Sequence, residues 1–278
     1  MRILSVMDLN KKYEQFELSN VSFTLEKGTI TGFIGRNGAG KTTTLKSLLN
    51  FVHPDRGEIL FFGREFKDSE FEIKQKVGFV SGGINYYPKK KIKVISATTR
   101  RFYKQWDNRA YSHYMDMFKL DENKTPDELS EGMKVKYSLA LALSHNAELL
   151  ILDEPTSGLD PVSRDDLLGV FLELEAKGIT ILFSTHITSD LDKCADNILY
   201  IKNGKILANT HMNSFLSQYR VLELTEEQLT DDLKLKLIGC KKSKYGYSAL
   251  IKTADCRNVN AKMSDVDLES AMVHLERE

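Results

Sequence analysis

Residues 35–42 read Gly-Arg-Asn-Gly-Ala-Gly-Lys-Thr, and this stretch decides how the rest of the chain is interpreted. It fits the phosphate-loop pattern G-x-x-x-x-G-K-[ST], in which glycines let successive backbone N–H groups converge on phosphate oxygens. The β-rich run at residues 29–34 precedes the loop, and apolar residues at helical spacing follow it. This order predicts a strand, a phosphate-binding loop and a helix whose N-terminus adds positive potential. A flexible glycine turn before a helix is the alternative interpretation.

The loop predicts ATP and Mg²⁺ as cofactors. We expect Lys41 to reach the β- and γ-phosphates, and the hydroxyl of Thr42 to bind Mg²⁺. The residues of the loop that we expect to bind nucleotide are Gly35, Arg36, Asn37, Gly38, Ala39, Gly40, Lys41, Thr42 and Thr43.

A second motif, Leu-Leu-Ile-Leu-Asp-Glu at residues 149–154, ends in two carboxylates. The continuous apolar run is typical of a buried parallel strand. We expect Asp153 to hold Mg²⁺ through water, and Glu154 to polarise the attacking water. An ordinary strand followed by a polar turn is the alternative, and the neighbouring phosphate loop argues against it.

Leu129, Ser130 and Gly132 complete a set of motifs that closely resembles the ATP-binding cassette ATPases over residues 1 to about 210. That family carries a Leu-Ser-Gly-Gly-Gln signature, and this chain has Glu131 and Met133 at the two remaining places. The resemblance implies that Ser130 and Gly132 touch the γ-phosphate bound by an opposite subunit. A hydroxyl and a helix N-terminus suit such an anion, although a plain helix cap is the alternative.

Three more positions match the family's pattern. Asp160 ends the sequence Ser-Gly-Leu-Asp, which resembles the subunit-contact loop. His186 ends a predicted strand where the family places a switch histidine that bridges the γ-phosphate and the opposite subunit. Tyr13 falls where the family stacks an aromatic ring on adenine. Their ordinary alternatives are a turn before a helix, a strand-end histidine and a packed surface tyrosine.

One departure from the family follows the predicted strand at residues 77–80. The family usually has a glutamine there, which helps to sense Mg²⁺ and couples to the membrane partner. This chain continues Ser-Gly-Gly-Ile at residues 81–84, and Gly82 at the approximate place cannot ligate anything. Water, Ser81 or Asn85 would have to substitute. We expect the ATPase to run, and the coupling step to be the one affected.

The expected fold class is α/β, a P-loop NTPase cassette with a mixed-sheet core, an inserted helical subdomain and a small C-terminal α+β appendage. We place the cassette at residues 1–211, its helical subdomain at about 84–145, and the appendage at 212–278. Ser163 with Asp166 predicts a capping box that opens a helix at 164–177. The dipeptide at 203–204, Asn-Gly, predicts a hairpin turn.

Bulk composition points to a reduced protein of the cytoplasm. Among 278 residues, 39 are Lys or Arg and 39 are Asp or Glu, so overall charge does not favour nucleic acid as a partner, and we expect none. The three cysteines are odd in number and lack metal-ligand spacing. We find no signal peptide and no run near the ~18 apolar residues that a membrane span needs. Together with these absences, the resemblance to the ATP-binding cassette ATPases implies a protein peripheral to the cytoplasmic face of the membrane, with a separate transmembrane permease subunit.

The leading hypothesis is a transporter motor in which two copies, expected to form a homodimer, sandwich ATP and drive export. Within its family the chain looks most like bacterial exporter ATPases of the phenol-soluble modulin group, which implies amphipathic or antimicrobial peptides as cargo. Export of drugs or lipids is an alternative. Lysines and arginines at residues 89–101 form either a solvated face or a contact with the membrane partner or lipid head groups.

Two hypotheses come from other classes of protein. A soluble cassette ATPase acting on ribosomes or DNA usually has two cassettes or a long coiled-coil insertion, and this chain has one cassette and no sustained heptads. A small-molecule kinase would leave Ser130, Gly132 and His186 without a role.

Overall fold

The computed structural model describes residues 1–82, 87–244, 246–257 and 259–277. The chain divides into two compact units, Met1–Asn209 and Thr210–Glu278. The boundary expected from the sequence lay slightly later, after residue 211. The first unit contains two sheets and the second contains one, and each unit has its own apolar core.

A six-stranded sheet forms the centre of the first unit, with the strand order β10-β9-β3-β8-β7-β6. Its strands are β3 (Ile30–Ile34), β6 (Val77–Ser81), β7 (Leu149–Asp153), β8 (Thr180–Thr185), β9 (Asn197–Lys202) and β10 (Lys205–His211). The pairs β6–β7, β7–β8, β8–β3 and β3–β9 are parallel, and β3, β7 and β8 are buried along their whole length. The continuous apolar runs of the sequence therefore became buried parallel strands, whose carboxyl ends share one edge.

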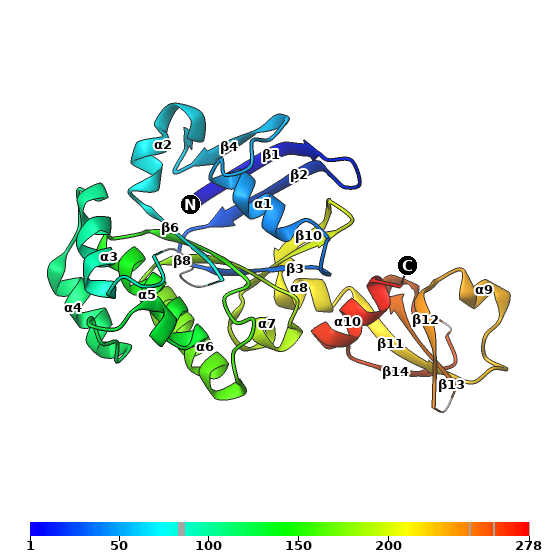
Figure 1. The fold of residues 1–278 in the computed structure, drawn as a ribbon. Helices are drawn as coiled ribbons and strands as arrows, with labels where there is room; N and C mark the ends of the chain where they lie inside the picture. The colour runs from blue at the N-terminus through cyan, green and yellow to red at the C-terminus, as the bar shows by residue number, and fades with distance from the viewer. Residues whose placement is uncertain (83–86, 245, 258, 278) are drawn as a thin grey trace. The chain divides into compact units, whose positions relative to one another are not determined.

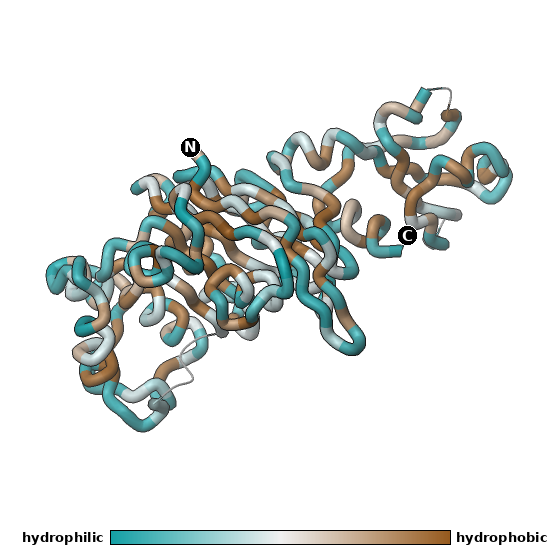
Figure 2. The backbone as a smooth tube through the Cα atoms, turned by 90° about the horizontal axis from the view of Figure 1, so that it is seen from above, coloured by the Kyte–Doolittle hydropathy of each residue, from teal (hydrophilic) through white to brown (hydrophobic). Residues whose placement is uncertain are grey.

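A smaller antiparallel sheet has the strand order β2-β1-β4-β5. Its strands are β1 (Arg2–Lys12), β2 (Glu17–Glu26), β4 (Arg56–Phe61) and β5 (Arg64–Glu65). Helix α1 (Lys41–Leu48) lies between the two sheets, and α2 (Phe66–Lys74) connects β5 to β6 (Figure 1). Leu45 and Leu48 of α1 belong to a core cluster with residues from both sheets. Figure 2 shows hydrophobic stretches of the chain, in brown, gathered in the interior of this unit.

Helices α5 (Glu131–Ser144), α6 (Pro161–Ala176) and α7 (Thr188–Cys194) lie on the other side of the six-stranded sheet from α1 (Figure 1). Helices α3 (Ile92–Thr99) and α4 (Asn108–Met117) precede α5, with the 3₁₀ turns Arg100–Phe102 and Pro126–Glu128 between them. The Ser96 hydroxyl joins α3 to α4 and α5, because it lies 2.8 Å from the Tyr111 hydroxyl and 2.7 Å from the Tyr137 hydroxyl. The helical character expected of this insertion is confirmed from residue 87 onward, and residues 84–86 lie outside the described chain.

The predicted start of α6 is wrong. The helix begins at Pro161, and Asp160 is its N-cap, with Oδ1 accepting hydrogen bonds from the N–H groups of Val162 and Ser163 at 3.0 Å each. A proline at the first helical position has no N–H to satisfy and a φ angle suited to a helix, so the helix starts there. The predicted cap at Ser163 lies inside the first turn.

The predicted hairpin is confirmed. β9 and β10 are neighbours in the sheet, joined by Asn203 and Gly204 with φ angles of 48° and 73°. Two successive positive φ angles are what a type I′ turn requires, and Asn-Gly is the dipeptide that best accepts them.

The second unit is a small α+β domain, as expected. Its sheet has the order β12-β13-β11-β14, and α10 (Leu268–Leu275) packs on β12 and β13. The strands are β11 (Tyr219–Leu224), β12 (Leu237–Ser243), β13 (Gly246–Lys252) and β14 (Lys262–Ser264), and the short helices are α8 (Met212–Leu216), α9 (Asp231–Lys234) and the 3₁₀ turn Thr253–Asp255. Within the part of the chain that the structure describes, no helix has both the length and the apolar character that crossing a bilayer requires.

Candidate functional site

The loop at residues 35–40 joins β3 to α1 and depends on its glycines. Gly38 and Gly40 have φ angles of 82° and 114°, which side chains rarely tolerate. At Gly35, an added Cβ would lie 2.3 Å from the carbonyl oxygen of Ile201. The backbone is therefore free to wrap closely, as binding to phosphate requires.

Lys41 is buried in this loop, with only 5% of its surface exposed. Its Nζ donates to the carbonyl oxygen of Gly35 at 2.7 Å and lies 3.3 Å from Oε1 of Glu154. The ammonium group is thus held at the loop by backbone oxygens and paired with one carboxylate.

Thr42 and Asp153 lie side by side, from α1 and from the end of β7. The Thr42 hydroxyl donates to Oδ1 of Asp153 at 3.1 Å, and the Ser184 hydroxyl donates to the same oxygen at 2.7 Å. Mg²⁺ prefers such hard oxygen ligands, and in nucleotide sites it completes its shell with phosphate oxygens and water. The two residues fit the role that the sequence predicts for them.

Glu154 lies between Lys41 and His186. Its Oε2 accepts a hydrogen bond from Nδ1 of His186 at 2.9 Å, so that nitrogen carries the hydrogen, and its N–H donates to the Ser184 hydroxyl at 2.9 Å. Glu154 has a φ of 50°, in the left-handed region that is unusual for a residue with a long side chain. The surrounding contacts hold the carboxylate beside the phosphate loop.

These groups border one cavity of about 630 Å³. Its lining consists of Gln15, Phe16, Arg36, Asn37, Gly38, Gly40, Lys41, Thr42, Thr43, Glu154, Ser157 and His186. The structure therefore brings together the phosphate loop, the predicted base and the predicted switch histidine. Gly35 and Ala39 belong to the same loop, and Asp153 is hydrogen-bonded to Thr42, which is one of the lining residues.

An aromatic residue that the sequence analysis missed, Phe16, lines this cavity, and an added Cβ on Gly40 would lie 2.8 Å from its ring. Tyr13 is not among the described lining residues; it is 44% exposed, with its ring centroid 6.5 Å from that of Phe16. The Tyr13 N–H bonds to the Phe16 carbonyl at 2.8 Å, so the chain turns back here. This tight turn brings Phe16 to the phosphate loop, and no pattern in the sequence predicts it.

Ser130 and Gly132 lie at the start of α5, apart from this cavity's lining. The Ser130 hydroxyl caps α5 by accepting from the Met133 N–H at 3.3 Å. An added Cβ on Gly132 would lie 3.6 Å from Leu159 and 3.7 Å from Ser163, so the signature adjoins the loop that carries Asp160. Hydrogen bonds from Ser163 and Val162 lower the pKa of Asp160, which keeps this cap ionised.

Ser81 and Gly82, where the family usually has a glutamine, lie next to Asp153, the proposed Mg²⁺ ligand. Ser81 pairs with Asp153 in the β6–β7 register, and Gly82 follows with a φ of 56°. Asn85, the other candidate substitute, lies outside the described residues.

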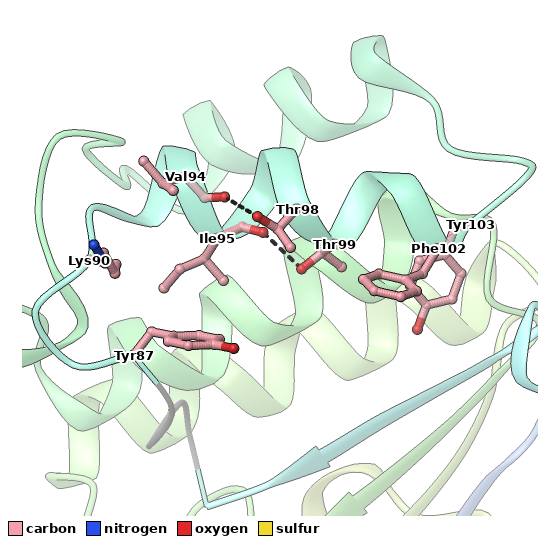
Figure 3. Close-up of a pocket in the computed structure, with 8 residues that line it drawn as sticks. All are labelled: Tyr87, Lys90, Val94, Ile95, Thr98, Thr99, Phe102 and Tyr103. Atoms are coloured by element: carbon pink, nitrogen blue, oxygen red, sulfur yellow. Dashed lines mark hydrogen bonds between the residues drawn. The ribbon is translucent and has the colours of Figure 1, made fainter.

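A second cavity, of about 500 Å³, lies along α3 in the helical part of the first unit (Figure 3). Figure 3 shows Lys90 at one end of the row and Phe102 and Tyr103 at the other. Phe102 is 69% exposed. The lining is Tyr87, Lys90, Val94, Ile95, Thr98, Thr99, Phe102 and Tyr103, which we call the α3 groove.

The end of the α3 groove is fixed to the rest of the unit. The Gln75 side chain donates to the Phe102 carbonyl at 2.9 Å and accepts from the Lys104 N–H at 2.8 Å. The Tyr103 ring stacks on His145 at 3.8 Å between centroids, and His145 is the C-cap of α5. Burial lowers the pKa of His145 to about 4, so this ring is neutral near pH 7.

Comparisons with known proteins agree with this geometry. The profile of the ABC transporter family matches residues 18–157. The bacitracin transport ATP-binding protein BcrA of Bacillus licheniformis is 33% identical over 239 residues, which cover 84% of this chain and 76% of that protein. The Nod factor export ATP-binding protein I of Burkholderia orbicola is 34% identical over 208 residues, covering 72% and 68%.

A solved ATP-binding subunit of an ABC transporter superposes with a TM-score of 0.70 at 28% identity, covering 78% of this chain and 92% of that one. The predicted P-loop NTPase cassette is thereby confirmed. With its phosphate loop, paired carboxylates and matching relatives, this chain belongs to the ABC transporter family and is an ATP-binding, ATP-hydrolysing cassette.

Proposed function

We propose that two copies of this chain close on ATP and drive export through a separate permease subunit at the cytoplasmic face of the membrane. The observation that carries the proposal is the separation of two anion-binding features. The phosphate loop cavity contains Lys41 and Glu154, whereas Ser130 caps α5 outside its described lining. In the proposed dimer, a second copy facing the first brings its Ser130 and Gly132 to the ATP bound by the first.

Within each site the expected roles follow the contacts. The loop N–H groups and Lys41 bind the phosphates, and Thr42 and Asp153 hold Mg²⁺, which would neutralise phosphate charge. Glu154 takes a proton from the attacking water, and His186 orients its carboxylate through the 2.9 Å hydrogen bond. Tyr13 or Phe16 stacks on the adenine ring.

The permease would contact the α3 groove. Residues 87–104 around it contain seven Lys or Arg residues (89, 90, 91, 93, 100, 101 and 104) and no Asp or Glu. In the groove, the Thr98 and Thr99 hydroxyls bond to their own helix at 2.9 Å each, which leaves a largely apolar wall. An amphipathic cytoplasmic helix with acidic residues beside its apolar face complements such a surface.

A permease bound in the α3 groove could also be coupled to the ATP site without the glutamine that the family usually has after β6. Phe102 and Tyr103 line the groove, and Tyr103 stacks on the residue that ends α5. Because α5 begins at Ser130, a shift of the groove end would reach the signature through one rigid helix.

The direction of transport is proposed as export. The name of one relative, the Nod factor export ATP-binding protein I, supports this direction. Amphipathic or antimicrobial peptides are the cargo we propose, and drugs or lipids are the alternative.

The test uses Phe102→Glu, with Leu172→Glu as the matched control on an exposed site of α6. The permease encoded beside this gene is co-expressed, and co-purification, permease-stimulated ATPase and export are measured. Phe102→Glu should lose all three at least tenfold while the ATPase of the isolated chain stays within twofold, and Leu172→Glu should lose none. Equal behaviour of the two variants would contradict the groove assignment, and co-purification with ribosomes or DNA instead of a permease would contradict the transporter function.

A further inference from the structure

Asp190 is a buried carboxylate that the catalytic roles above leave unused. It lies in the first turn of α7 and is 1% exposed. Its Oδ2 accepts a hydrogen bond from the Thr156 hydroxyl at 2.6 Å, and Thr156 is fully buried. Charged side chains are rarely buried unless they have a partner or a role, so this contact needs an explanation.

The contact joins the two segments that carry the catalytic pair. Thr156 lies two residues after Glu154, in the loop that leaves β7. Asp190 lies four residues after His186, on the helix that follows β8. The Thr156–Asp190 hydrogen bond therefore links the loop that carries Glu154 to the segment that carries His186. It is a second link between these segments, in addition to the 2.9 Å hydrogen bond between the side chains of Glu154 and His186.

A third element meets the same carboxylate. Nε of Arg164, on α6, lies 3.9 Å from Oδ1 of Asp190, and neither atom has a hydrogen-bond partner among the described residues. Both atoms are buried and face each other, so removing either charge would leave the other buried without a charged partner, which is costly. Arg164 follows Asp160 by one helical turn, so α6 brings the proposed subunit-contact loop to this cluster.

The backbone conformation of Glu154 explains why a contact that holds its loop in place would matter. With a φ of 50° the residue is in a disfavoured conformation, which persists only when neighbouring contacts hold it. On one side the Ser184 hydroxyl accepts from its N–H, and on the other the Thr156–Asp190 bond fixes the loop.

We propose that Asp190 is a positioning residue for ATP hydrolysis: through Thr156 and Arg164 it holds Glu154 and His186 in the relative placement that water attack requires. It is buried and is not among the described residues that line the nucleotide cavity. Its loss lowers the rate of the chemical step and leaves the phosphate loop intact, because small displacements of a catalytic group are enough to reduce rate severely.

The test compares Thr156→Val, which removes the hydroxyl at nearly constant size, with Thr156→Ser, which keeps it. We expect kcat per nucleotide-binding site to fall about tenfold or more in Thr156→Val, with KM for ATP within twofold of the wild type. Thr156→Ser should recover most of the rate. Asp190→Asn, which keeps the shape but removes the charge facing Arg164, should lose kcat in the same way.

The control is Asp165→Asn. Asp165 and Lys193 form an exposed ion pair that also joins α6 to α7, so this variant breaks a link between the same helices at the surface. Its kcat should stay within twofold, as exposed pairs contribute little.

Single-turnover hydrolysis with Glu154→Gln separates positioning from general damage. Adding Thr156→Val to Glu154→Gln should change the residual rate by less than twofold, since the group being positioned is already gone. The proposal is overturned if Thr156→Val and Asp190→Asn keep the wild-type kcat, if they raise KM as much as they lower kcat, or if Thr156→Val slows the Glu154→Gln enzyme equally.

Discussion

Lys41 has two competing partners, the loop that holds it and the carboxylate that it must release. Its Nζ donates to the Gly35 carbonyl and is also 3.3 Å from Glu154. A γ-phosphate that takes up the lysine charge would free Glu154 to interact with water and with His186. Nucleotide binding would in this way prepare the base, using only residues already in contact.

Glu154→Gln tests this arrangement. We expect the steady-state ATPase rate to fall about 10²- to 10⁴-fold, because the amide cannot accept the proton of the attacking water. The affinity for ATP should be unchanged or tighter, since Lys41 loses a competing carboxylate, and light scattering should show a dimer that accumulates with ATP. Lys41→Ala is the control that loses ATP affinity instead. Normal turnover of Glu154→Gln would refute the assignment of the base.

His145 predicts a pH dependence of stability. Burial lowers its pKa from 6.5 to about 4, so between these values the unfolded chain binds a proton that the folded chain does not. The unfolding free energy should therefore fall as the pH decreases from 6.5 toward 4, by up to about 3 kcal/mol from this residue. Urea unfolding, followed by fluorescence of the sole tryptophan, Trp106, would measure it.

His145→Gln is the comparison for this experiment. The variant removes the titrating ring, so its unfolding free energy should depend less steeply on pH over the same interval. Parallel pH curves for variant and wild type would show that His145 does not cause the effect.

Single residues were predictable where a motif fixes their spacing. Lys41 and Thr42 could be placed because they follow the loop in the strand–loop–helix order, and Asp153 because it ends the apolar run that forms β7. Phe16 could not, because a local turn determines which aromatic ring of that segment meets the loop. Asp190 could not either: its partners are Thr156 and Arg164, and the packing of three elements brings them together.

At the scale of elements, α6 shows how a cap decides where a helix begins. Both Asp160 and Ser163 are residues that cap helices well, and sequence alone allows either. Proline at position 161 settles the choice, since it fits the first helical position and makes Asp160 the residue before the helix. The same residue would then serve the subunit contact and the stability of α6.

Asp160→Ala should lower the unfolding free energy, because the N–H groups of Val162 and Ser163 lose their acceptor. Asp160→Asn should lower the unfolding free energy much less than Asp160→Ala, since the amide oxygen of asparagine still accepts these hydrogen bonds. Asp166→Ala, at the other end of the capping box expected from the sequence, should stay within about 0.5 kcal/mol. Urea unfolding of the three variants measures these differences, and a larger loss for Asp166→Ala than for Asp160→Ala would restore the original assignment.

At the scale of the whole molecule, the proposed nucleotide chemistry belongs to the first unit, which contains the six-stranded sheet. Every proposed catalytic and nucleotide-binding residue lies in the first unit. The change in composition after about residue 212 was enough to predict a second unit, because its short strands and terminal helix form an independent pattern. What the second unit does could not be predicted, since it carries no motif with a chemical role.

A truncated chain of residues 1–211 tests this division. It keeps all of β10, the edge strand of the six-stranded sheet, and so leaves no strand cut. We expect it to fold and to bind ATP within about threefold of the full chain's affinity, since that sheet and its helices have their own core. Glu154→Gln should abolish hydrolysis in the truncated chain as it does in the full chain. A chain ending at residue 204 is the matched control: it loses β10 and should unfold at lower urea, because β9 is then exposed as an edge strand. Failure of the 1–211 chain to fold would show that the cassette depends on the second unit for its core.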